Sequence, residues 1–310
     1  MLACAMEESI WNLPGQPAPK GDAEGVVNAN GYDLFYESYG KDARKGTVVC
    51  LHGGPGGTLD GFRPLIDLTN HGYRVVMYNQ MGSYKSQMPK NKSLLTVEHF
   101  VEELEAVRLS LNLGKINIIG QSWGGMLAMV YALKYQDNMK SMVTNGGPAN
   151  VPLCLSEMTR RKLELPVDVQ KTLQKYEDVG DYGNPEYMGA TEVYYRNFLC
   201  RLPKWPPELL YEFRHLSKLV YETMWGPTEF VCTGALRYWD ITSKLREIRV
   251  PTLVTCGRYD EVSPVVCKSA HEEIKSSKFH IFENSAHESL WDETENYLST
   301  IRSFLDQQNQ

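Results

Sequence analysis

The sequence INIIGQSWGGMLAMVYALKYQ, residues 116–136, joins a short apolar run to a longer one through a Gly-x-Ser-x-Gly turn. The first run, INIIG (116–120), has the length and the β-branched residues of a buried parallel strand. The second run, after Gly124, has the length of a helix. A strand that passes into a helix through such a turn is typical of a nucleophile elbow, which holds a serine at the edge of a sheet. The stretch therefore predicts an α/β sheet with Ser122 as the candidate nucleophile.

Five further apolar runs share the features of the first, since each is short and bounded by turn residues. Such runs suit the inner strands of a parallel sheet that is covered on both faces. A helix fits at 97–111, where apolar residues recur with helical spacing among Glu and Arg. Residues 26–40 indicate a hairpin around Asn30-Gly31. The five runs are TVVCLH (47–52), YRVVMYN (73–79), MVTNGG (142–147), PTLVTCG (251–257) and KFHIFEN (278–284).

Strand and helix alternate over residues 47–148 and again over 248–305, which predicts a mostly parallel, doubly wound α/β sheet. The stretch between them holds no comparable strand run and is dense in tyrosine, tryptophan and proline. We interpret it as a mostly helical cap inserted over the strand ends. The predicted domains are a core of residues 1–148 and 241–310 and a cap domain of residues 149–240.

The composition is that of a globular chain: 310 residues, of which 42% are hydrophobic and 23% charged. A net charge of −6 gives no reason to expect nucleic acid as a partner, because that partner requires a basic surface. No apolar run reaches the roughly 20 residues of a membrane span. The N-terminus has no basic region, and Glu7 and Glu8 interrupt its apolar stretch. It therefore does not resemble a secretory signal. We therefore expect neither nucleic acid nor a membrane as a partner.

The seven cysteines are odd in number, scattered and never in C-x-x-C spacing. Free buried thiols in a reducing compartment explain this pattern better than disulfides or a metal site. We expect a cytoplasmic protein that needs no metal ion and no organic cofactor. The sequence leaves the oligomeric state open.

The glycine-rich sequence HGGPGG (52–57) directly follows an apolar run. Such a loop lets backbone N–H groups approach a substrate oxygen closely, because no Cβ intervenes. In hydrolases with a nucleophile elbow, one oxyanion donor comes from such a loop and the other from the residue after the nucleophile. This assigns the N–H groups of Gly54 and Trp123. We expect Gly53 to contact the substrate and His52 to brace the loop. A phosphate-binding loop is the rival interpretation, but neither Gly-Lys-Ser/Thr nor G-x-G-x-x-G is present.

The candidate acid and base lie further along the chain. In hydrolases of this kind the order is nucleophile, acid, base. Asp260 and Glu261 lie just beyond one apolar run, and His287 lies beyond the next. Open α/β sheets bind ligands at these carboxyl ends of strands. A serine hydroxyl needs an adjacent base, and the base needs a carboxylate that fixes its tautomer. We predict His287 as the general base and Asp260 as its orienting acid, with Glu261 as the alternative acid.

With these residues in place, the sequence resembles the proline iminopeptidase family of α/β hydrolases, and within it the tricorn-interacting aminopeptidases. The resemblance runs from about residue 27 to about residue 305 and implies an α/β-hydrolase fold with an inserted cap. The patterns HGGPG and G-x-S-x-G alone are shared by many hydrolases, whereas the cap segments NPEY, WPPELL and WGPTEF are more specific. The family's catalytic triad matches Ser122, Asp260 and His287.

The resemblance also implies an amine-binding site. Two glutamates that hold the free α-ammonium of the substrate match Glu229, in the cap, and Glu261. An exopeptidase has to desolvate a charged amine beside the scissile bond, and this is costly unless carboxylates replace the lost water. Without the resemblance, Glu229 would be interpreted as part of an ordinary salt bridge in the cap. Glu288, next to the candidate base, is expected to be solvated; a contribution to the acidic rim of the site is the alternative.

One loop departs from the family pattern. The family commonly carries Asp-Gln-Arg-Gly-x-Gly-x-Ser after the second parallel strand, whereas this chain has NQMGSYKS at 79–86. The loss of the acid and the arginine removes a bracing ion pair near the oxyanion loop. Tyr84 and Lys85 add bulk and charge near the site. The departure bears on the substrate more than on the chemistry.

The resemblance implies a serine hydrolase that cleaves amide bonds of small substrates with a free N-terminus, either peptides or aminoacyl amides, through an acyl-enzyme. An esterase or lactonase with the same triad is one alternative. A ligand-binding member of the fold without turnover is a second. An epoxide hydrolase or dehalogenase would carry an aspartate in place of Ser122.

Overall fold

The computed structural model describes residues 9–17, 21–41 and 43–308. Its centre is an eight-stranded sheet with the order β1-β2-β4-β3-β5-β6-β7-β8. The first two strands run antiparallel to their neighbours, and the other six are parallel. The strands are β1 (Ala23–Ala29), β2 (Tyr32–Tyr39), β3 (Gly46–Leu51), β4 (Tyr73–Tyr78), β5 (Ile116–Gln121), β6 (Met139–Asn145), β7 (Thr252–Gly257) and β8 (Ser277–Phe282).

The predicted hairpin and apolar runs form these strands. Asn30 and Gly31 both have positive φ, which is the backbone that a two-residue hairpin turn requires. They join β1 to β2 with Ala29 opposite Tyr32. The predicted α/β fold class is therefore confirmed, including its mostly parallel sheet.

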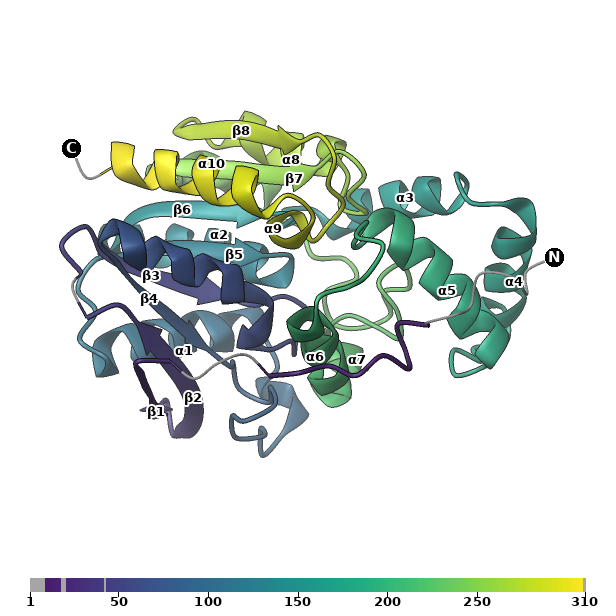
Figure 1. Cartoon of the computed structure of the whole chain (residues 1–310), viewed down its shortest axis with the longest axis horizontal. Helices are drawn as coiled ribbons and strands as arrows, with labels where there is room; N and C mark the ends of the chain where they lie inside the picture. Colours follow the sequence, from purple (N-terminus) through teal and green to yellow (C-terminus); the bar gives the residue numbers. More distant parts are fainter. Residues whose placement is uncertain (1–8, 18–20, 42, 309–310) are drawn as a thin grey trace.

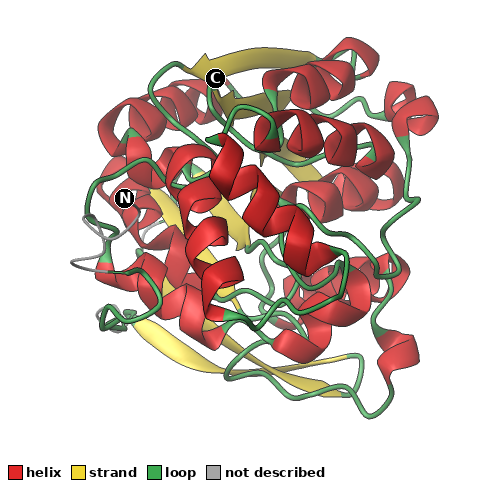
Figure 2. Ribbon diagram, turned by 90° about the vertical axis from the view of Figure 1, so that its right-hand side faces the viewer, coloured by secondary structure: helices red, strands yellow, loops and turns green. Residues whose placement is uncertain are grey.

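Helices cover both faces of the sheet, as Figures 1 and 2 show. Side chains along a strand alternate between faces. Val49 and Leu51 of β3 accordingly pack in one apolar cluster, and Val48 and Cys50 pack in the other. The helical elements of the core are η1 (Leu59–His71), η2 (Lys92–Leu94), α1 (Val97–Ser110), α2 (Trp123–Tyr135), η3 (Gln136–Asn138), η4 (Thr242–Glu247), α8 (Pro264–Glu273), α9 (Ser289–Asp292) and α10 (Thr294–Gln307).

The stretch between β6 and β7 is helical in its larger part. Residues 149–240, all of them described, contain no strand and only two isolated β-bridges. In Figure 1 these helices lie beyond one end of the sheet, opposite the C-terminus. This arrangement is consistent with the predicted cap, and the domain boundaries proposed above remain our proposal. The helices are α3 (Val151–Lys162), α4 (Val167–Glu177), α5 (Pro185–Phe198), α6 (Pro207–His215) and α7 (Lys218–Met224).

Among the described residues, no helix is both long and apolar enough to cross a membrane. Six cysteines are free and buried, and the seventh, Cys4, lies outside the described residues. The six are Cys50, Cys154, Cys200, Cys232, Cys256 and Cys267.

Candidate active site

Ser122 lies on the sharp turn between β5 and α2. Its backbone has φ 54° and ψ −120°, a conformation that non-glycine residues rarely adopt and that is found at functional turns. The turn is held by the Ser122 N–H, which donates to the carbonyl of Asn145 at 2.8 Å. This geometry is that of a nucleophile elbow.

Two glycines make this turn possible because backbone passes close to them. A Cβ on Gly120 would lie 2.2 Å from the carbonyl oxygen of Gly124. A Cβ on Gly124 would lie 1.8 Å from the carbonyl oxygen of Leu51, on the neighbouring strand. The spacing of glycines around Ser122 therefore has a steric cause.

Asp260 and His287 form a buried pair. The Nδ1 atom of His287 lies 2.7 Å from Oδ1 of Asp260, and the same oxygen accepts from the N–H of Val262 at 2.8 Å. Asp260 is fully buried, and 3% of His287 is exposed. Burial alone would lower the pKa of His287, but the charge of Asp260 and its hydrogen bond, together with Glu261 and Glu288, raise that pKa to about 10.

A network of buried polar side chains binds the backbone carbonyl of His287. Its carbonyl oxygen accepts from the amide of Gln121 at 2.8 Å and from that of Asn145 at 3.3 Å. Asn145 also donates to Gln121 Oε1 and accepts from the hydroxyl of Thr255. These three residues come from β5, β6 and β7, so the sheet itself fixes the loop that carries His287.

The nucleophile and the base open into one pocket of about 650 Å³, including its mouth. Ser122, Gly53, Gly54, Glu229 and His287 all line it. In the described part of the chain, the Ser122 hydroxyl and the His287 imidazole are not hydrogen-bonded to each other. Such bonds commonly tighten only when substrate binds. The structure thus brings together the predicted nucleophile, base and oxyanion loop.

A second, narrower pocket begins at the same serine. Its lining is apolar apart from Ser122 and Glu229. It lies between the start of α2 and the cap, so its walls come from both parts of the chain. The apolar side chains are Trp123, Met126, Pro148, Met158, Trp225 and Val262.

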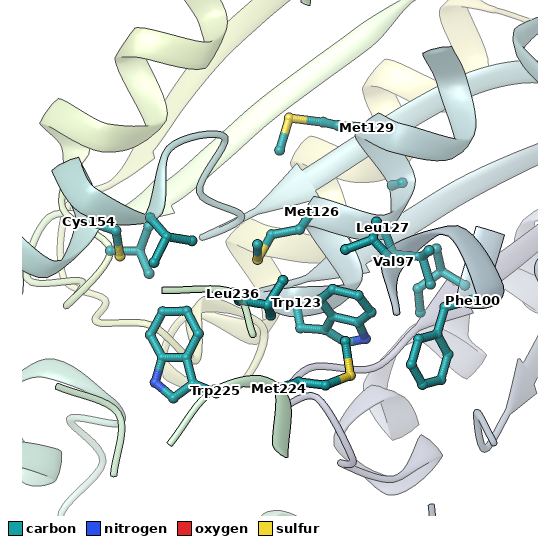
Figure 3. Packing of buried hydrophobic residues seen from close by; sticks show 14 of the residues in the cluster. Val97, Phe100, Trp123, Met126, Leu127, Met129, Cys154, Met224, Trp225 and Leu236 are labelled. Carbon is teal, nitrogen blue, oxygen red and sulfur yellow. The ribbon is translucent and has the colours of Figure 1, made fainter. Parts of the chain in front are cut away.

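Figure 3 shows the packing around this second pocket. Trp123 and Met126 of α2 belong to the same apolar cluster as Met224 and Trp225 of the cap. On its other side the Trp123 ring meets Phe100 of α1, with 5.5 Å between ring centroids. The cap and the core therefore share one continuous apolar interior beside Ser122.

Glu229 and Glu261 are two buried carboxyl groups close to the base. Burial raises the pKa of both carboxyl groups, and their mutual repulsion raises that of Glu261 further. Glu229 accepts a hydrogen bond from the Tyr221 hydroxyl at 2.6 Å. Glu261 is fully buried, and among the described residues neither of its carboxylate oxygens has a hydrogen-bond partner. Buried carboxylates without a cation are costly, so this pair favours a positively charged ligand.

Two further carboxylates line the large pocket. Glu288 was expected to be solvated, but it is half-buried in the pocket wall, and burial above all raises its pKa to about 7. Its place in the pocket lining favours the other interpretation, a contribution to the acidic rim of the site. Glu212 of α6 lies in the same wall and accepts from the N–H of Thr58 at 3.2 Å.

The end of α5 is bonded to both loops that carry the candidate acid and base. The carbonyl of Phe198 accepts from the N–H of Glu261 at 3.1 Å and from that of His287 at 3.2 Å. The next carbonyl, that of Leu199, accepts from the N–H of Glu288 at 2.8 Å. The cap is thus part of the framework that positions these loops.

The oxyanion loop and the departing loop at 79–86 lie side by side. His52 is bonded to both of them, as expected of a bracing residue. Lys85 lies over the ring of Phe35, 4.3 Å from its centroid, so its charge does not line the pocket. The Tyr84 hydroxyl lies 2.6 Å from that of Tyr211 in the cap.

Several residues around the site had no signal in the sequence. Glu212 lies on an amphipathic helix, where a carboxylate normally faces solvent. Gln121 and Asn145 are unremarkable amides until three strands bring them together behind His287. Within the described residues, no group of three or more His, Cys, Asp or Glu side chains could hold a metal ion.

Comparisons with known proteins agree with this geometry. Residues 46–294 match the family model described as alpha/beta hydrolase fold, so the chain is an α/β hydrolase. Proline iminopeptidase of Saccharolobus solfataricus is 41% identical over 286 residues, which cover 92% of each chain. That of Thermoplasma volcanium is 38% identical and covers 91% of this chain and 96% of its own. The chain belongs to the proline iminopeptidase family, as the sequence motifs predicted, and is a serine hydrolase of the aminopeptidase type.

Solved structures resemble the whole described fold. The crystal structure of VinJ matches with a TM-score of 0.90 at 34% identity, covering 93% of this chain and 99% of VinJ. Proline iminopeptidase of Mycobacterium smegmatis matches with a TM-score of 0.87 at 25% identity and the same coverage. These matches include the helical stretch between β6 and β7.

Proposed function

We propose that this protein removes an N-terminal residue, proline above all, from small peptides or aminoacyl amides through an acyl-enzyme on Ser122. The single observation that carries the proposal is the buried pair of Glu229, which lines both pockets together with Ser122, and Glu261, which interacts with Glu229. The oxygens of Glu261 have no partner among the described residues. A substrate ammonium would supply the missing charge and hydrogen bonds.

In the proposed mechanism, the hydroxyl of Ser122 attacks the carbonyl carbon of the first residue while Nε2 of His287 takes its proton. Asp260 holds the imidazole through Nδ1 and stabilises its charged form. The N–H groups of Gly54 and Trp123 donate to the oxyanion. The C–N bond then breaks as His287 returns the proton to the leaving amine. Water attacks the ester with the same base and releases the amino acid and free Ser122.

We expect the two pockets to bind different parts of the substrate, the N-terminal residue in one and the leaving group in the other. The narrow apolar pocket, with Glu229 in its wall, suits a pyrrolidine ring next to an ammonium. The leaving group has to lie on the side of His287, because His287 protonates it. The wider pocket contains His287 and opens outward, so it suits leaving groups of varied size.

Assays with prolyl p-nitroanilide and p-nitrophenyl acetate test this proposal. Ser122→Ala should lower turnover of both by at least about a thousandfold. Glu229→Gln should lower kcat/KM for the anilide roughly 10- to 100-fold, because a charge-assisted hydrogen bond is lost. The same variant should change the acetate rate by less than about twofold, because acetate carries no ammonium.

Two controls sharpen the comparison. Glu272→Gln removes an exposed glutamate of α8, whose side chain is 62% exposed, and should leave both rates unchanged. N-acetylprolyl p-nitroanilide keeps the ring but lacks the ammonium, so it should be a poor substrate of the wild type. Equal losses on anilide and acetate in Glu229→Gln, or ready cleavage of the acetylated anilide, would favour the esterase alternative.

We further propose a cytoplasmic location, which the free and buried state of the six described cysteines supports.

A further inference from the structure

One buried side chain joins the two halves of the proposed oxyanion hole. The two donors follow different strands, since Gly54 lies after β3 and Trp123, the first residue of α2, lies after β5. Gln80 lies in the loop after β4, with 1% of its surface exposed. Within the loop that departs from the family pattern, Gln80 is a position that matches it, and no step of the proposed chemistry uses it.

On one side, Gln80 holds His52 in two places. Its backbone N–H donates to Nε2 of His52 at 3.0 Å, and its side-chain amide donates to the His52 carbonyl at 3.2 Å. Burial lowers the pKa of His52 to about 4, so the ring is neutral. Because Nε2 accepts, the proton is on Nδ1, which donates to the carbonyl of Gly53 at 3.0 Å.

That bond fixes the direction of an oxyanion donor. The carbonyl of Gly53 and the N–H of Gly54 belong to the same planar peptide unit. In a trans unit the two groups point in opposite directions. The Gly53 carbonyl is held by His52 and also by the N–H of Gly57 at 3.1 Å. The Gly54 N–H is therefore held pointing the other way.

On the other side, Gln80 holds the residue after the nucleophile. Its Oε1 atom accepts from the indole N–H of Trp123 at 2.8 Å. Trp123 is the first residue of α2, and its ring is packed against Phe100. A restrained indole limits how far the backbone of Trp123 can shift.

We propose that Gln80 is a positioning residue of the oxyanion hole, which aligns the Gly54 and Trp123 N–H groups with each other through its side-chain amide. The inference rests on the proposed function, since it takes these two groups as the oxyanion donors. Gln80 touches no reacting atom. Its contribution should therefore appear when the oxyanion forms and not when substrate binds.

The test uses Gln80→Met, which keeps the length of the side chain but removes both amide hydrogen bonds. We expect kcat for prolyl p-nitroanilide to fall about tenfold, less than the 10²- to 10³-fold cost of losing a whole donor. KM should change by less than about twofold. Trp123→Phe removes the same bond from its other end and should give a similar loss. The double variant should lose less than the product of the two, because both remove one interaction.

Two inhibitors distinguish a loss of alignment in the oxyanion hole from a general loss of order in the active site. Pyrrolidine-2-boronic acid forms a tetrahedral adduct with the serine and places a hydroxyl in the oxyanion hole, whereas L-proline binds without an adduct. In Gln80→Met the Ki of the boronic acid should rise by about the factor by which kcat/KM falls. The Ki of L-proline should change by less than about twofold.

Asn117→Leu is the matched control. Asn117 is a buried amide that donates to the carbonyl of Thr47 and accepts from Ser141, so it also joins neighbouring strands, but at the opposite end of β3 and β5. Its loss should lower the Tm and leave the ratio of the two Ki values unchanged.

An unchanged ratio of Ki values in a folded Gln80→Met protein would overturn the proposal. If that variant does not fold, Gln80→Glu and Trp123→Phe are measured in its place, and the same criterion decides. Failure of the proposed function is distinguishable, because a wild type without the expected activity would bind the boronic acid no more tightly than L-proline.

Discussion

At the scale of single residues, the charge around His287 governs the chemistry. Three carboxyl groups, those of Asp260, Glu261 and Glu288, raise the pKa of this imidazole to about 10, against the opposing effect of burial. A general base has to be neutral to accept a proton. The raised pKa makes loss of the His287 proton the step that should limit activity on the acidic side of the pH profile.

We predict different pH profiles for free enzyme and complex. A substrate ammonium between Glu229 and Glu261 would offset the negative charge that raises the pKa of His287, so this pKa should fall on binding. The profile of kcat/KM reports the free enzyme and that of kcat reports the complex. Both should rise with pH as His287 loses its proton, and the midpoint for kcat should lie at the lower pH. Coincident midpoints would contradict an ammonium next to these carboxylates.

At the scale of elements, a helix of the cap is bonded to the acid loop. Arg161 of α3 is 7% exposed and donates to the carbonyls of Asp260 at 3.2 Å and Arg258 at 2.9 Å. Its guanidinium also lies 5.3 Å from the ring centroid of Phe198. One side chain thus ties α3, the end of α5 and the acid loop together.

Arg161→Met should leave these carbonyls without their donor, at a cost of about 1–3 kcal/mol in the free energy of unfolding. The kcat for prolyl p-nitroanilide should fall as well, because the backbone of Asp260 is less well held. Arg160→Met is the control on the same helix, since Arg160 makes only half-exposed ion pairs with Glu157 and Glu164, worth less than about 1 kcal/mol. Equal effects of the two substitutions, measured by denaturant unfolding and kcat, would refute a special role for Arg161.

The elements differ in how well the sequence predicts them. The hairpin at Asn30-Gly31 and the elbow at Ser122 are predictable because local chemistry alone, positive φ and close backbone approach, determines each of them. The helix η1 could not be predicted from the sequence, because Pro64 lies inside it. Its apolar face becomes evident only when it packs on the sheet.

The site shows the same contrast. Asp260 and His287 could be placed because each lies in the loop that follows a strand, β7 and β8 respectively. Glu212, Gln80 and Arg161 could not, because their partners lie far away in the sequence.

At the scale of the whole molecule, the N-terminal segment of residues 9–17 is hydrogen-bonded to two helices of the cap. Ser9 donates to Glu192 at 2.6 Å, and the indole of Trp11 donates to the carbonyl of Met188, both on α5. The N–H of Gln16 donates to the carbonyl of Pro207 on α6. Ile10, between these bonds, is 5% exposed and packs in the main apolar cluster. The segment therefore joins α5 to α6.

Ile10→Asp should release this segment, because it places an unpaired charge in an apolar contact. We expect a loss of at least about 2 kcal/mol in the free energy of unfolding. The KM for prolyl p-nitroanilide should rise, because α6 carries part of the pocket wall. Val26→Asp, at a position 61% exposed on β1, should change stability by no more than about 0.5 kcal/mol. Equal changes in the free energy of unfolding and in KM for the two substitutions would argue against a role of the N-terminal segment in holding α5 and α6.

The carbonyl of Phe198 accepts hydrogen bonds from the N–H groups of both Glu261 and His287. This has a consequence for the construction of chimeras. A cap transplanted from a relative would bring its own α5 terminus, and the two recipient loops would have to meet a foreign backbone. Grafts that divide the chain between cap and core should often fold and yet be inactive. A successful exchange would take the α5 terminus, the acid loop and the base loop from a single parent, although almost 90 positions separate the first from the last.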